Sequence, residues 1–362
     1  MPLMVRSGWG WMAAAWLVVG GQPPPEPEGV QRAVALAGKL NHADSEQRLT
    51  AARALLLLAA VPAELLEPLR AALKCPESEV RQVAALMLAR MGRPAQVAAP
   101  QLEPLVNDPE PRVRAAALTA LLRLTVDPAA LRPLLLRRLE DTDADVRQAA
   151  VLGLAAAGPS PQHVGLLRAR LRDAHPQVRR AAAFALGKWG PAALPAAPAL
   201  EKLCIDPELE LRFEAAWARF RINRSPTAVE VFRTALTERR PDGGRAVGAF
   251  LADNLVEGRE LAPMVRTLLE TTEGSARHRL LELMPGLSAD AQAVAAAYLV
   301  SKLGDAKWES HASTALTRLG RTALPALREA ERSGDQEVRE RAGELIRRIE
   351  RVRPTGPRRP PN

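Results

Sequence analysis

Histidine and cysteine are the residue types of this sequence with the clearest potential for catalysis or metal binding, but their spacing is unsuitable for either. The chain has 362 residues and five histidines: His42, His163, His175, His278 and His311. Two histidines four residues apart on one helix face would suit a metal ion, and no two of these have that spacing. Two cysteines, Cys75 and Cys204, are too few for a zinc site or a disulfide framework. We therefore expect no metal site and no cofactor.

The short motifs that place a nucleophile or a phosphate are missing as well. There is no Gly-x-Gly-x-x-Gly, no phosphate-binding loop and no Gly-x-Ser-x-Gly. Aspartate and glutamate are abundant, but they recur at regular intervals, and no carboxylate pair stands out as a general acid and base. The sequence thus predicts no catalytic residue and a protein that is not an enzyme.

What recurs instead is an arginine, at steps of 30 to 33 residues. The anchor positions are Arg48, Arg81, Arg114, Arg147, Arg179, Arg212, Arg245, Arg277, Glu309 and Arg339. Four residues before the anchor, eight of the ten repeats have an acidic residue, and three residues after it nine have a small one. Ten residues after it, all are apolar. These columns show that most of the chain is a repeat array.

The sequence of each repeat predicts two helices. Five repeats have a proline fourteen residues before the anchor, which suits the first turn of a first helix: Pro100, Pro133, Pro198, Pro263 and Pro325. The acidic column suits the start of a second helix, near the positive end of its dipole. Apolar positions −1, +3, +7 and +10 then form one stripe at helical spacing. Since two helices cannot bury that stripe alone, we expect the repeats to stack into an α-solenoid.

The segment Asp141–Ala150 reads Asp-x-Asp-x-x-Val-Arg-x-Ala-Ala, with Leu154 and Gly158 following. This pattern resembles HEAT repeats, and most closely the bacterial subgroup related to phycobiliprotein lyases. The resemblance covers about residues 30–350; it is clear in repeats two to six and ten and weak in repeats seven to nine. It implies an all-α, armadillo-like fold, a right-handed α-solenoid of about ten two-helix HEAT-type repeats of about 33 residues.

The resemblance also gives the arginine row a structural role. An aspartate six residues before the anchor lies in the turn between the two helices, where it can accept the arginine of the adjacent repeat. We expect such a ladder, rather than a ligand-binding row, from Arg48, Arg81, Arg114, Arg147, Arg179 and Arg212 with Asp108, Asp141, Asp173 and Asp206.

Aromatic side chains gather at one repeat position. Phe184, Trp217 and Phe250 stand five residues after three consecutive anchors, and at about 100° per residue that position points away from the buried stripe. Two interpretations are open: lateral packing between helices, because Leu86 and Leu152 share the position, or an exposed strip on the concave surface. On the second, the candidate partner-binding residues are Phe184, Trp217, Phe250, Phe213, Phe220 and Arg180.

The two ends of the chain differ from the array. Residues 1–21 have the layout of a secretory signal peptide, with Arg6, an apolar run over Trp9–Val19 and small residues after it. Residues 22–29 are a Pro-rich linker, 30–350 the solenoid, and 351–362 a basic, Pro-rich tail expected to be disordered. We expect export to the periplasm or beyond; a misassigned start codon would leave the protein cytoplasmic. The mature chain has no membrane-spanning segment.

The sequence favours a monomeric, non-enzymatic binding scaffold whose concave surface takes a protein, a peptide or another extended ligand. One alternative is nucleic-acid binding, which the formal net charge of +9 permits, although the last sixteen residues hold +5 of it. The other, implied only by the resemblance, is an enzyme like the phycobiliprotein lyases that attaches a cofactor.

Overall fold

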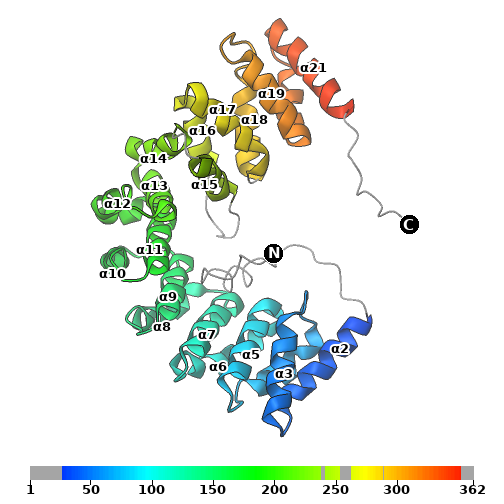
Figure 1. Ribbon diagram of the computed structural model, residues 1–362, viewed down its shortest axis with the longest axis vertical. Coiled ribbons are helices and arrows are strands. Elements are labelled where there is room, and N and C mark those ends of the chain that lie inside the picture. Colours follow the sequence, from blue (N-terminus) through cyan, green and yellow to red (C-terminus); the bar gives the residue numbers. More distant parts are fainter. Residues whose placement is uncertain (1–26, 238–240, 253–261, 288, 352–362) are drawn as a thin grey trace. The chain divides into compact units, whose positions relative to one another are not determined.

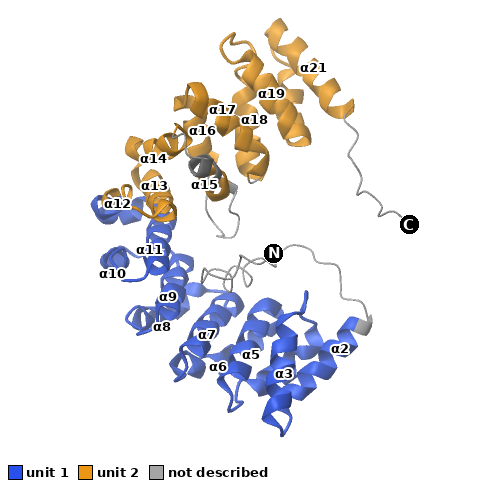
Figure 2. Cartoon of the chain, viewed as in Figure 1, with its two compact units in different colours: residues 1–200 blue, residues 201–362 orange. Residues whose placement is uncertain are grey.

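The fold comes from a computed structural model that describes residues 27–237, 241–252, 262–287 and 289–351. The chain divides into two compact units, unit 1 up to Leu200 and unit 2 from Glu201 (Figure 2). The predicted signal peptide, most of the linker and residues 352–362 of the predicted tail lie outside the described residues, so these predictions stay untested.

Unit 1 is built from pairs of helices. The first helices of the pairs are α2 (Pro27–Gly38), α4 (Leu66–Ala72), α6 (Ala99–Leu102), α8 (Arg132–Arg138) and α10 (Val164–Arg170). The second helices are α3 (Ser45–Leu56), α5 (Ser78–Met91), α7 (Pro111–Leu124), α9 (Ala144–Ala156) and α11 (Pro176–Trp189). The second helices pack side by side in chain order, and the first helices cover one side of that row (Figure 1).

Unit 2 continues the same alternation. Its first helices are α12 (Ala197–Leu203), which begins before the unit boundary, α14 (Pro226–Thr237), α16 (Ala262–Thr271), α18 (Ala289–Val300) and α20 (Leu324–Ala330). Its second helices are α13 (Leu209–Asn223), α15 (Pro241–Ala252), α17 (Gly274–Leu283), α19 (Glu309–Leu319) and α21 (Gln336–Arg351). The described residues thus form ten helix pairs and no strand, which confirms the predicted all-α solenoid of two-helix repeats.

The repeat columns explain where the helices begin and which side of them is buried. Each of the five prolines is the second residue of a first helix. In seven repeats the residue of the acidic column directly precedes the second helix, and Asp143 caps α9 by accepting hydrogen bonds from the N–H groups of Asp145 and Val146. In α7 the stripe of Val113, Ala117, Leu121 and Leu124 is almost completely buried, as its helical spacing predicts.

In several repeats the turn that joins one pair to the next has a residue with positive φ. Gly158 and Gly190, both eleven residues after an anchor, have φ of 83° and 59°. A side chain at these values is strained, so glycine lets the second helix stop and the next first helix begin. The longest described helix, α21, has 16 residues, whereas a span of the hydrocarbon core needs about 20; no described helix is both long and apolar enough for one.

Candidate functional site

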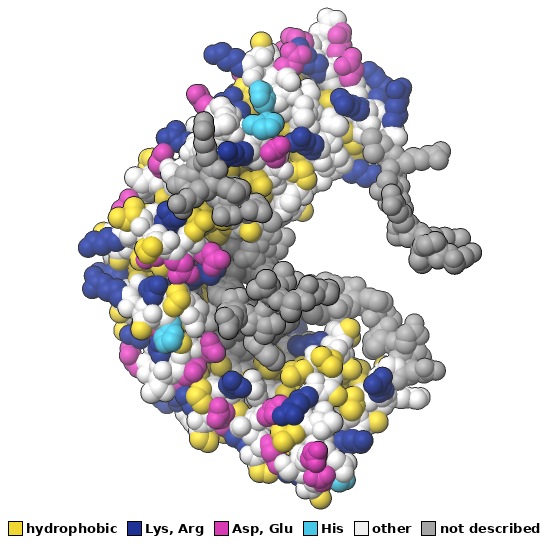
Figure 3. All heavy atoms as spheres, viewed as in Figure 1, with side chains coloured by type: hydrophobic (Ala, Val, Ile, Leu, Met, Phe, Trp, Pro, Cys, Tyr) yellow, Lys and Arg dark blue, Asp and Glu magenta, His cyan; other side chains and the backbone are white. Residues whose placement is uncertain are grey.

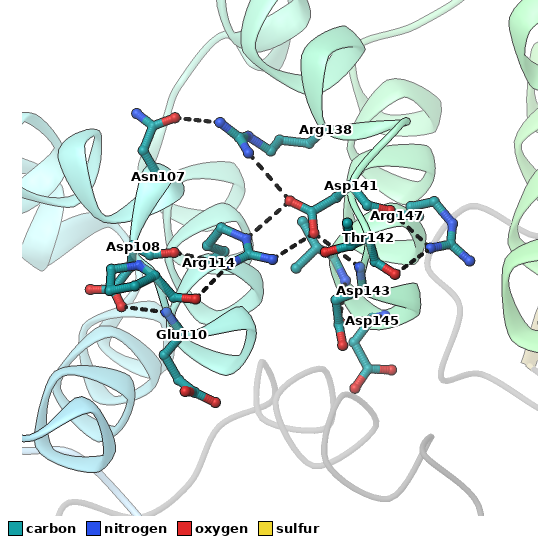
Figure 4. A network of polar contacts seen from close by, with 12 residues as sticks. Asn107, Asp108, Glu110, Arg114, Arg138, Asp141, Thr142, Asp143, Asp145 and Arg147 are labelled. Carbon is teal, nitrogen blue, oxygen red and sulfur yellow. Dashed lines mark hydrogen bonds and ion pairs between the residues drawn. The ribbon is translucent and has the colours of Figure 1, made fainter.

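The anchor arginine joins neighbouring repeats in unit 1. In α7, Nη1 of Arg114 donates to the carbonyl oxygens of Asp108 and Pro109, both 3.0 Å away, and so closes the turn of its own repeat. Its Nε and Nη2 donate to the two carboxylate oxygens of Asp141, in the turn of the next repeat, at 3.0 and 2.6 Å (Figure 4). The guanidinium therefore holds two consecutive turns at once.

The same bidentate contact occurs on either side of that repeat. Arg81 donates to Asp108 at 2.8 and 2.9 Å, and Arg147 donates to Asp173 at 2.8 Å from both nitrogens. These are arginine–aspartate pairs of the expected ladder. Each aspartate also accepts the N–H two residues later, which shapes the turn; the oxygen of Asp141, for example, accepts from Asp143 at 3.1 Å.

The aspartates of these pairs are almost fully buried and remain charged. Burial by itself raises the pKa of a carboxyl group, but hydrogen bonds from arginine and from the turn N–H outweigh it. The pKa of Asp108, Asp141 and Asp173 therefore lies below the usual value. A hydrogen bond to Asp141 likewise raises the pKa of Arg114.

Arg48 departs from the predicted pattern because Cys75 stands where the next aspartate would be. Its guanidinium pairs instead with Glu77, two residues further on, with Nε 2.9 Å from Oε2. That hydrogen bond lowers the pKa of Glu77 to about 2. The carboxylate acceptor has thus moved from the turn to the residue before the second helix, a shift that the six-residue spacing did not predict.

Beyond α11 the ladder changes. Arg179 donates to the carbonyl oxygens of Asp173 and Ala174, whereas its predicted partner Asp206 belongs to the other unit, so that pair stays a prediction. Arg239, outside the described residues, stands where the acceptor of Arg212 would be. In unit 2 the guanidinium carbon of Arg277 lies 4.0 Å from the ring centroid of Trp308, a cation–π contact in place of an ion pair.

Acid should destabilise unit 1 through these pairs. A carboxyl group whose pKa is lowered by folding contributes stability that is complete above its ordinary pKa and is lost as the pH falls through the folded value. The ordinary value for aspartate is 3.8. We expect the urea midpoint of unfolding to fall steadily below about pH 4. The triple variant with Asp108, Asp141 and Asp173 changed to asparagine should be less stable at neutral pH and less sensitive to acid. Equal acid sensitivity in both proteins would refute this explanation.

The prediction of an exposed aromatic strip is wrong. Trp217 is 0% exposed, Phe213 and Phe220 are buried in α13, and Phe184 is buried in α11 of unit 1. The ring of Phe213 stacks on Phe232 of α14, with centroids 4.9 Å apart, and meets the half-buried Phe250 edge to face at 5.7 Å.

The aromatic residues are buried because they pack laterally between helices, which is the other of the two interpretations given for this repeat position. A second helix contacts other helices on more than one side, so a position that points away from the buried stripe still meets a neighbour. Phe213 contacts a ring of the next first helix, α14, and a ring of the next second helix, α15. Arg180 is half-buried in α11. The aromatic residues of this column are therefore buried or half-buried between helices rather than exposed as a strip.

A groove of about 650 Å³ lies elsewhere, on the second-helix row of unit 1. Its floor is formed by buried or half-buried side chains of α5 and α7: Val83, Leu86, Ala115, Ala116 and Thr119. Its rim is formed by more exposed charged side chains: Arg53 of α3, Glu79 of α5, Glu110 just before α7, Arg112 of α7 and Asp145 of α9. Leu56, Ser78 and Gln82 complete the lining.

Small residues explain why the groove is here. At the first and fifth positions after the anchor, α7 has Ala115 and Thr119, where α9 has Gln148 and Leu152. The hydroxyl of Thr119 donates to the carbonyl oxygen of Ala115 at 2.9 Å, so it turns back onto its own helix. In the sequence, the groove is marked by small side chains at these two repeat positions, whereas the predicted strip was based on large aromatic residues there.

The described residues offer no metal site and no activated thiol. No group of three or more histidine, cysteine, aspartate or glutamate side chains among them is arranged to hold a metal ion. Cys75 and Cys204 are free and buried. Burial raises the pKa of Cys75, and it raises that of Cys204 to about 11, so both thiols are protonated near neutral pH and are weak nucleophiles.

Comparison with known proteins identifies the repeats. A family model described as HEAT repeats matches residues 33–122, 98–173 and 164–251, which together span more than half of the chain. No curated protein matches the sequence.

Solved structures show a weaker likeness. A crystal structure of an engineered protein is 20% identical with a TM-score of 0.45, over 88% of this chain and 98% of that one. A second engineered protein is 24% identical with a TM-score of 0.43, over 53% and 96%. The X-ray structure of the Escherichia coli protein YibA is 19% identical with a TM-score of 0.39, over 92% and 100%.

Proposed function

Because the chain belongs to the HEAT repeat family, we propose that it is a non-enzymatic binding scaffold, and that its unit 1 holds an extended segment of a polypeptide in the groove over α3, α5 and α7. Stacked helical repeats present long surfaces that suit such ligands. The observation that carries the proposal is the groove itself, with a floor of small and apolar side chains and a charged rim.

The dimensions of the groove favour a polypeptide over a compact ligand. Packed helices lie about 8–10 Å apart, so a path across three of them is about 20 Å long. An extended chain covers that distance with about six residues, at about 3.3 Å each. The floor offers apolar area for partner side chains, while Gln82 and Ser78 offer hydrogen bonds to a backbone.

Nucleic-acid binding is the weaker candidate. A nucleic-acid surface gathers lysine and arginine along one face. On the face shown in Figure 3, basic and acidic side chains are interspersed over both units. The rim of the groove has three carboxylates against two guanidiniums, which opposes a phosphate backbone.

Filling the groove should abolish peptide binding without unfolding the protein. The double variant Ala115→Gln/Thr119→Leu gives α7 the residue types that α9 has at the same repeat positions, so the helix packing should persist. We expect peptides selected from a displayed library of random twelve-residue sequences to bind the wild type, and to bind this variant at least about tenfold more weakly by fluorescence polarisation.

A matched control is available in unit 2. Ser310 and Thr314 hold the same two repeat positions in α19 and are exposed. The variant Ser310→Gln/Thr314→Leu should bind the selected peptides like the wild type. The proposal fails if no peptide is selected, or if the groove-filled variant keeps the affinity of the control.

A further inference from the structure

The charges on the rim are not balanced. Arg53 and Glu79 neutralise each other, because Nε and Nη2 of the arginine lie 2.8 and 3.0 Å from the two carboxylate oxygens. On the rest of the rim that pair leaves one guanidinium, Arg112, and two carboxylates, Glu110 and Asp145. The groove therefore has a net negative rim on a chain whose formal net charge is positive.

Glu110 is free to meet a ligand. It occupies the residue before α7, but its side chain accepts no hydrogen bond from the start of that helix, unlike Asp143 before α9. The backbone N–H of Glu110 is already bonded to Asp108, at 3.0 Å. The fold thus uses the backbone of Glu110, and its half-buried carboxylate lines the groove.

The pKa of Asp145 lies above its usual value. Loss of hydration, and then the neighbouring carboxylate of Asp143, raise the pKa of Asp145. His175 and Gln177 at the start of α11 and Arg112 of α7 act in the opposite direction without cancelling that rise. A further cation beside this carboxylate would stabilise its charged form.

The floor and the rim together define the chemistry of a ligand. Val83, Leu86 and Ala115 accept an apolar side chain, and the adjacent carboxylates accept a cation. Successive side chains of an extended segment point to opposite sides, and residues two apart point to the same side. A cation and an apolar group that enter the groove together must therefore be close in the ligand's sequence.

We propose that the groove of unit 1 selects polypeptide segments in which lysine or arginine lies within two residues of a large apolar side chain. The apolar side chain rests on the floor over Ala115 and Thr119, and the cation binds between Glu110 and Asp145. This inference rests on the proposed function and adds the class of partner to it. An acidic segment is excluded, because it would place like charges beside these two carboxylates.

The experiment compares selections from the random twelve-residue library at low ionic strength, where partly exposed ion pairs are least screened. Wild-type protein should enrich lysine or arginine within two residues of leucine, isoleucine, methionine or phenylalanine. The neutral variant Glu110→Gln/Asp145→Asn should lose the enrichment of basic residues and keep that of apolar ones. A control variant with the same charge change outside the groove, Glu64→Gln/Glu103→Gln, should behave like the wild type.

Affinities of one selected peptide then test the contact directly. We expect the neutral variant to bind it about fivefold more weakly, and a peptide with the basic residue changed to glutamine to bind wild type and neutral variant equally. The inference is overturned if selection shows no preference for basic residues, or a preference for acidic ones. If groove filling still abolishes binding in that case, the proposed function stands without this inference; if groove filling has no effect, both fail.

Discussion

Replacing Trp217 by alanine is expected to destabilise unit 2 by about 3–5 kcal/mol, the usual effect of removing a large buried aromatic side chain. Trp217 is completely buried in α13, near Phe213, which is itself stacked on Phe232. The cavity that remains cannot fill without movement of the neighbouring helices. Urea unfolding followed by circular dichroism measures the change.

The same experiment separates a packing role from a binding role. Trp217→Phe should lose clearly less stability than Trp217→Ala, because phenylalanine keeps most of the buried area. Under conditions where each variant is folded, both should bind the selected peptides like the wild type. Unchanged stability together with lost binding would restore the aromatic strip as a site.

Replacing Arg114 by alanine should destabilise unit 1 by about 3 kcal/mol, the lower end of the range for breaking a buried ion pair. The substitution leaves the carboxylate of Asp141, 4% exposed, without its bidentate partner, and it leaves the carbonyl oxygens of Asp108 and Pro109 without a donor. Arg138, 3.3 Å from Asp141, still compensates part of the negative charge of that carboxylate, so we do not expect a larger effect.

A double-mutant cycle tests whether the ladder is the cause. Arg114→Ala combined with Asp141→Asn should cost less than the sum of the single changes, because the neutral amide no longer needs a cation. Arg137→Ala, an exposed arginine in α8, should change stability by less than about 0.5 kcal/mol. Additive effects in the cycle would show that Arg114 and Asp141 do not stabilise each other.

Periodicity predicted much of the fold because the solenoid repeats one helix pair with the same local contacts. The apolar stripe of α7, the prolines of the first helices and the pairs Arg114–Asp141 and Arg147–Asp173 all follow from fixed offsets within one repeat and the next. Where a repeat departs from the pattern, the fixed offset no longer predicts the partner of the anchor arginine. Cys75 stands at the position of the aspartate, so Arg48 pairs with Glu77, and Arg277 lies over the ring of Trp308 instead of a carboxylate.

The candidate site was harder to predict because it depends on neighbouring helices. Helical periodicity gives the direction of a side chain around its own helix, but not whether another helix lies there. Phe213 points away from the stripe of α13 and still meets Phe232. Ala115 and Thr119 point in a comparable direction, but they are too small to fill the space that Gln148 and Leu152 fill in the next repeat.

The central claim is that a polypeptide segment binds in the groove of unit 1, and photo-crosslinking tests it most directly. A photoreactive phenylalanine in place of Leu86, which lines the groove, should crosslink a selected peptide bound to the folded protein. The same probe in place of Thr314, exposed on α19, should give no crosslink. Mass spectrometry should find the peptide attached at position 86. No peptide should be attached there when Ala115→Gln/Thr119→Leu is added, because the filled groove no longer binds it. Crosslinking at position 314 instead, or at position 86 regardless of groove filling, would contradict the account.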